Sequence, residues 1–147
     1  MHKGDIDPHA ISIARSNAAK AGVEDVIRME GTASIEKTEY GWHLNYEAVN
    51  CEDEKSRLRS DIKLEADTRR AIVVNEGEGY GLLLDPEAVT ATQIKTPRGT
   101  LTLNVKTKEV QWDLAGRRDG SVVLEYMLLV GMQPVSALRV SLFLKKE

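Results

Sequence analysis

The feature that most constrains this fold is an alternation of apolar and polar residues that recurs from Val26 onward. Successive side chains of a strand point to opposite faces, so a period of two predicts strands with one buried face. The apolar sets are Trp42, Leu44 and Tyr46; Ile62 and Leu64; Leu101, Leu103 and Val105; Val110, Trp112 and Leu114; and Leu138, Val140, Leu142 and Leu144. We expect these sets to line one common interior.

Turn-forming residues separate the alternating segments. They are Asn75 to Gly77 with Gly79, Asp85 to Glu87, Thr96 to Gly99, Arg118 to Gly120, and Gly131 to Pro134. Glycine, proline, asparagine and aspartate at such spacing are typical of tight connections between antiparallel strands. The pattern predicts about eight strands, and closure into a barrel is the usual way to bury so many short strands without exposed edges.

The segment from Asp7 to Gly22 has a different pattern. Asp7 is a suitable N-cap, Pro8 suits a first helical turn, and Gly22 suits a helix end. Apolar residues recur there at spacings of three and four, namely Ala10, Ile11, Ala14, Ala18 and Ala21. This spacing predicts one N-terminal α-helix with a narrow apolar face.

Size and composition limit the functional classes. The chain has 147 residues, a length at which one domain buries a sufficient core. Its 20 basic and 23 acidic residues give a net charge of -3, which disfavours nucleic acid as a partner. A single cysteine, Cys51, excludes an internal disulfide. The sequence shows neither a secretory leader nor an apolar run of about 20 residues, so we expect a cytoplasmic protein without membrane spans.

The stretch from Trp42 to Glu147 resembles the YwiB-like family of small bacterial calycin-like barrels, a family whose role is unassigned. The matching residues are Trp42 to Glu47, Thr96 to Leu101, Thr107 and Lys108, Gly120 to Tyr126, and Gly131 to Pro134. The resemblance implies a lipocalin-like β-barrel over residues 25–147. The family's opening strand has no visible counterpart, because the expected helical segment, residues 1–24, occupies its place.

A second resemblance covers only Gly4 to Val23, which is similar to part of a class I S-adenosylmethionine-dependent RNA methyltransferase. In that family an acidic residue accepts hydrogen bonds from the cofactor ribose, and Asp5 has the matching position. The glycine-rich loop and the Asn-Pro-Pro-Tyr or Asp-Pro-Pro-Tyr motif of such enzymes are missing. A methyltransferase remnant or subunit is therefore an alternative hypothesis.

Arg98 is a candidate ligand contact. It would lie at a barrel rim, where a guanidinium can pair with a carboxylate or phosphate. The alternative interpretation is a plain turn, with Pro97 at its second position and Gly99 after it.

Four aromatic residues are further candidates, namely Trp42, Tyr46, Trp112 and Tyr126. In a calycin-like barrel they could line a cavity for one small ligand, or they could fill the interior as core. A buried tyrosine hydroxyl would require a polar partner in either case.

Residues for catalysis or for holding metals and cofactors are not evident. His2, His9 and His43 lack metal-ligand spacing, and the acidic segment Glu76 to Gly81 is unsuited to phosphate. We therefore expect neither an enzyme nor a cofactor. The leading hypothesis is a barrel that binds a small apolar or amphipathic ligand. A third hypothesis is an interaction module whose open barrel edge pairs with another copy, so that the protein is a monomer or a homodimer.

Overall fold

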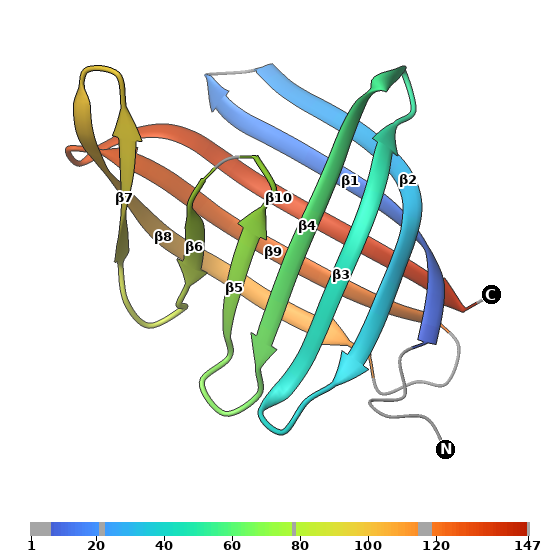
Figure 1. The fold of residues 1–147 in the computed structure, drawn as a ribbon. Coiled ribbons are helices and arrows are strands. Elements are labelled where there is room, and N and C mark those ends of the chain that lie inside the picture. The colour runs from blue at the N-terminus through green and yellow to red at the C-terminus, as the bar shows by residue number, and fades with distance from the viewer. Residues whose placement is uncertain (1–6, 21–22, 78, 115–118, 147) are drawn as a thin grey trace.

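The computed structural model describes residues 7–20, 23–77, 79–114 and 119–146. These residues form a single antiparallel sheet of ten strands, in the order β6-β5-β4-β3-β2-β1-β10-β9-β8-β7 (Figure 1). The strands are β1 (Asp7–Lys20), β2 (Val23–Lys37), β3 (Gly41–Asn50), β4 (Asp53–Glu65), β5 (Arg70–Asn75), β6 (Gly81–Leu84), β7 (Thr90–Thr96), β8 (Gly99–Asp113), β9 (Asp119–Val130) and β10 (Gln133–Lys146). The mostly β, antiparallel fold class is confirmed.

The sheet curls into a nearly closed barrel whose seam lies between β6 and β7, the two ends of the strand order. A side-chain hydrogen bond crosses this seam, from Thr90 Oγ1 to the carbonyl oxygen of Leu83. The end of β1, the start of β2 and the turn joining β3 to β4 lie at one end of the barrel, the upper end in Figure 1. The turns joining β2 to β3 and β4 to β5 lie at the opposite end.

The core is a continuous set of apolar side chains that point into the barrel. Leu44, Ile62 and Leu142 are at most 1% exposed, so the inward-facing sets predicted from alternation are largely confirmed. Leu101 departs from that prediction, because it lies near the free end of β8 and is 38% exposed.

Two of the predicted apolar sets belong to one strand, β8. The ladder between β8 and β9 shifts register between Thr107 and Glu109, so one additional residue is inserted there. Such a bulge reverses the phase of the alternation. Inward positions therefore change from odd numbers, such as Val105, to even numbers, such as Val110.

The predicted N-terminal helix is wrong: Asp7–Lys20 is strand β1. It pairs along one edge with β2 and along the other with β10, so both of its edges gain hydrogen bonds within the sheet. As a strand it buries the large side chains of Ile11 and Ile13, at 2% and 4% exposure. Tertiary pairing thus outweighs the local helical signals of Asp7, Pro8 and the alanines.

The strand count is also corrected, from about eight to ten. β1 fills the place of the opening barrel strand that the sequence did not reveal, and it pairs with β2 and β10 of the same sheet. β7 escaped the count because its sequence, rich in threonine, shows little apolar alternation. Among the described residues, no helix has the length and hydropathy that a membrane span requires.

Candidate functional site at the barrel mouth

The barrel interior is filled rather than hollow. A cavity among the core side chains has a volume of about 20 Å³, close to the space that a single water requires. The lining residues are Ile13, Arg15, Met29, Tyr46, Leu58, Ile62, Val73, Asn75, Leu124, Tyr126 and Val140. This cavity therefore has no room for a ligand larger than a water molecule.

We define the barrel mouth as the end of the interior occupied by Arg15, Ile27, Tyr46, Leu58 and Asn75. Leu58 and Asn75 are partly exposed there, whereas Tyr46 is 4% exposed and forms part of the floor. The end of β1, the start of β2 and the hairpin joining β3 to β4 lie around this end (Figure 1). The mouth combines a cation, amide and hydroxyl groups, and apolar side chains.

Arg15 lies on β1 two residues after Ile13, and the alternation of the strand directs it to the inner face. Its ladder partners are Val140 on β10 and Ile27 on β2. The side chain lines the cavity and is partly buried. No carboxylate of the described residues lies within ion-pair distance of its guanidinium.

Tyr46 belongs to a polar network behind Arg15. Ser60 is hydrogen-bonded to Tyr46, and Ser60 Oγ donates to Asn75 Oδ1 at 2.6 Å. Burial raises the pKa of Tyr46 above its ordinary value of 10.0, while the hydrogen bond with Ser60 and the positive charge of Arg15 partly oppose this rise. Tyr46 is therefore neutral at physiological pH.

This coupling leads to a prediction for the phenol titration. Replacing Arg15 by glutamine removes a positive charge that favours the tyrosinate, so we expect a higher pKa for Tyr46. Ultraviolet absorbance of tyrosinate, with Tyr46→Phe as the reference, measures the shift. Because the folded pKa exceeds the unfolded one, the stability linked to Tyr46 is complete below about pH 10 and falls as pH rises through the folded pKa. An unchanged or lower pKa in Arg15→Gln would contradict the inward placement of Arg15.

The four aromatic candidates divide into two groups. Tyr46 and Tyr126 line the same cavity, so the structure brings these two together. Trp42 and Trp112 pack against the core, and they lie at the start of β3 and near the end of β8. Figure 1 shows these strand ends at the end of the barrel opposite the mouth. There Arg69, from the turn between β4 and β5, lies 4.1 Å from the Trp112 ring centroid, and its guanidinium donates to a backbone carbonyl. Both tryptophans thus lie away from the mouth.

Arg98 lies in the turn between β7 and β8. Its backbone N–H donates to Thr96 Oγ1 at 3.2 Å, and Gly99 has a φ of 125°, which glycine accommodates readily. Arg98 lines none of the cavities or depressions described in this section. Asp5 lies outside the described residues.

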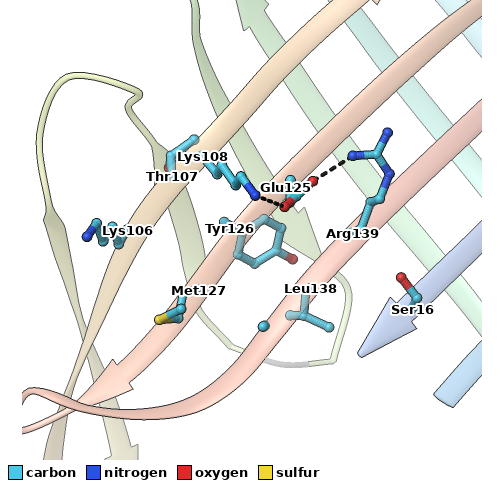
Figure 2. Close-up of a pocket in the computed structure, with 10 residues that line it drawn as sticks. Ser16, Lys106, Thr107, Lys108, Glu125, Tyr126, Met127, Leu138 and Arg139 are labelled. Carbon is cyan, nitrogen blue, oxygen red and sulfur yellow. Dashed lines mark hydrogen bonds and ion pairs between the residues drawn. The ribbon is translucent and has the colours of Figure 1, made fainter. Parts of the chain in front are cut away.

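The outer wall carries a broad depression over β8, β9, β10 and β1, with a volume of about 690 Å³. Figure 2 shows Glu125 between two cations, with its carboxylate 3.2 Å from Lys108 Nζ and 2.6 Å from Arg139 Nη1. The hydrogen bond from Arg139 lowers the pKa of Glu125. Arg139 Nη1 also lies 3.6 Å from Glu109 Oε2, so two carboxylates balance these two cations.

A polar cluster also covers β3 and β4 on the outside. His43 Nε2 lies 2.6 Å from Asp61 Oδ1, and Asn45 Nδ2 donates to the same oxygen at 3.2 Å. The described residues hold no group of three or more histidine, cysteine, aspartate or glutamate side chains arranged to bind a metal.

The architecture defines a nearly closed antiparallel barrel with a packed interior and a polar mouth. The chain belongs to the family described as domain of unknown function (DUF1934), whose model matches residues 11–142. Its structure is similar to the crystal structure of the ywiB protein from Bacillus subtilis, with a TM-score of 0.74 and 17% sequence identity. The similarity covers 97% of this chain and 93% of that one. No curated protein matches the sequence.

These comparisons confirm the YwiB-like resemblance and extend it to the N-terminal segment, since the family match begins inside β1. The methyltransferase resemblance finds no support in them. The helix that it implies is absent from the described part of residues 4–23, where the chain forms strands β1 and β2.

Sequence reasoning missed Arg15 because it placed this residue on a helix. A signal was present, since Ile11, Ile13 and Arg15 occupy alternate positions that share one face of a strand. Recognising the signal required knowing that the segment is a strand.

Proposed function

We propose that this protein is a non-enzymatic binder of a small amphipathic ligand, which it holds at the barrel mouth. The observation that carries the proposal is the cross-strand pair Arg15 and Ile27. Directly opposed residues of an antiparallel pair share one face, so the guanidinium lies beside an apolar side chain that is 42% exposed. An amphipathic molecule matches such a surface, and the filled interior favours the mouth over the lumen.

Titration with the neutral fluorescent apolar probe N-phenyl-1-naphthylamine tests this proposal. We expect saturable binding with one site per chain, and an affinity at least about fivefold lower in Ile27→Gln, because part of the apolar contact is lost. Phe143→Gln is the matched control, since Phe143 is 57% exposed on the outer wall and its replacement is expected to leave binding unchanged. Non-saturable binding, or equal effects of the two variants, would refute a site at the mouth.

A second candidate function rests on the seam. β7 pairs with β8 alone, and between Ala91 and Thr96 the described residues provide no strand for its other edge. This edge strand carries a single charge, Lys95, whereas the half of β4 that pairs with β3 alone, Asp53 to Leu58, is strongly charged. Charges protect strand edges from association, so β7 is the edge suited to antiparallel pairing with β7 of a second copy.

Light scattering across a concentration series tests this pairing. We expect a dimer that Ala91→Lys converts to a monomer, because it places a second lysine on the pairing edge. Asn104→Lys adds the same charge on β8 at a position that pairs with Ala91 of β7 and with Leu129 of β9, and is expected to leave the dimer intact. A wild-type monomer at all concentrations would refute edge pairing. We place either function in the cytoplasm, in keeping with the single exposed thiol of Cys51.

A further inference from the structure

We infer that the ligand carries an anionic head group, a carboxylate or a chemically similar oxyanion, and that Arg15 binds it. This inference rests on the proposed function and assigns the chemical class of its ligand. It concerns a residue that neither the family match nor the structural similarity singles out.

The first step is the contrast between Arg15 and the arginines of the outer wall. Arg59 lies 2.8 Å from Glu47, Arg139 lies 2.6 Å from Glu125, and Arg70 lies 3.0 Å from Glu65. Arg15 points inward instead, and within the described residues no acidic side chain pairs with it. The charge is partly removed from water, and no carboxylate of the described residues neutralises it.

Second, the partial burial of the Arg15 charge has a cost in free energy. A charge that is partly buried and unpaired is unfavourable, because the protein interior solvates it less well than water does. A ligand oxyanion supplies a counterion and accepts two parallel N–H···O bonds from the planar guanidinium. Binding is therefore favoured for an anion over a neutral molecule of the same shape.

The third step concerns the neighbours of Arg15. Tyr46 lies close enough to Arg15 for the positive charge of Arg15 to act on its phenol. Burial keeps this phenol neutral, so Tyr46 does not repel an anion. Asn75 contributes a side-chain amide to the same cavity. Ile27 and Leu58 provide apolar contacts next to these groups. The head group is thus directed to Arg15 and the apolar body to the rim.

A pair of dyes of similar size but different charge tests the inference. 1-Anilinonaphthalene-8-sulfonate carries a sulfonate, whereas N-phenyl-1-naphthylamine has the same aromatic body without it. For the intact wild-type chain we expect tighter binding of the sulfonate dye. Arg15→Gln should weaken it about tenfold or more, a loss in line with a charge-assisted hydrogen bond, while changing the affinity of the neutral dye less than twofold.

The matched control is Arg28→Gln. Arg28 is exposed on β2, and its ladder partner Ala14 faces outward, so the substitution removes the same charge from the outside of the barrel. It is expected to leave both affinities unchanged. Arg15→Lys keeps the charge but loses the planar pair of donors, and we expect it to retain part of the preference. It also provides a readout should Arg15→Gln fail to fold, and thermal unfolding of each variant identifies such a failure.

The results of the dye titrations distinguish a failure of the anionic head group from a failure of the proposed binding function. If the wild-type protein binds neither dye, the proposed function itself fails. If both dyes bind with equal affinity, or if Arg15→Gln weakens both alike, the anionic head group is refuted while the binding function stands. If Arg28→Gln weakens the sulfonate dye as much as Arg15→Gln does, the selectivity reflects net charge and the assignment to Arg15 is overturned.

Discussion

Replacing Gly31 by alanine is expected to lower the free energy of unfolding by about 3 kcal/mol, the upper part of the range for overpacked cores. Gly31 lies on β2 opposite Ala48 of β3, where the two backbones approach closely. A Cβ atom at position 31 would lie 1.9 Å from the carbonyl oxygen of Glu47 and 2.7 Å from the Ala48 Cα. Both are backbone atoms, so relief requires moving β3 away from β2.

Chemical denaturation followed by tryptophan fluorescence measures this effect. Gly81→Ala is the matched control, because the nearest atom to its added Cβ is a side-chain methyl carbon of Val74 at 3.2 Å. We expect that control to change stability by less than about 1 kcal/mol. Equal stabilities of the two variants would show that β2 and β3 are farther apart than the structure places them.

Truncating Leu142 to alanine is expected to cost about 2–5 kcal/mol, the usual range for a large side chain removed from a packed core. Leu142 on β10 is 0% exposed and lies between its ladder partners Ile13 on β1 and Val122 on β9. Neighbouring strands hold these backbones in place, so the space left by the side chain cannot close easily. The same denaturation experiment measures the loss.

Phe143 provides the control for Leu142. It is the next residue along β10, points outward and is 57% exposed, so Phe143→Ala is expected to change stability by about 0.5 kcal/mol or less. Comparable losses at the two positions would mean that the register of β10 differs by one residue, since such a slip exchanges the inner and outer faces.

The barrel has a packed interior and a partly exposed mouth, and this difference bears on the proposed function. Leu142 belongs to the packed part of the interior, whereas Arg15 belongs to the mouth. A site beside a tightly packed core holds its groups in place before a ligand arrives. That preorganisation reduces the entropy that binding has to overcome.

The strand pattern was predictable where the two faces of a strand differ strongly. Leu138 to Leu144 on β10 alternates regularly, and the structure buries the residues that the alternation assigned to the interior. The two sets on β8 were also found, although their union into one strand was not. The bulge near Lys108 joins them, and a bulge is set by the ladder with β9 rather than by local sequence.

The strand conformation of the N-terminal segment could not be predicted from its local sequence. Residues 7–20 contain alanines and a capping aspartate, features that favour a helix when a segment is considered alone. Their strand conformation depends on hydrogen bonds with β10, more than a hundred residues away in the chain. Arg15 was overlooked for the same reason.

The candidate site was predictable only in part. Tyr46 and Tyr126 were identified as possible lining residues, and the structure places both at one cavity. Trp42 and Trp112 were grouped with them because alternation identifies which side chains face inward. It does not show how far along the barrel axis each one lies, a position that depends on strand register.

By itself the sequence determined the antiparallel β class and most of the inner face, because a period of two is a local property that follows from strand geometry. Only the tertiary structure decided that residues 7–20 complete the barrel, that the interior is filled, and that Arg15 faces its mouth. Each of these depends on pairing between distant strands, and the free energy of such pairing is not encoded in any one segment.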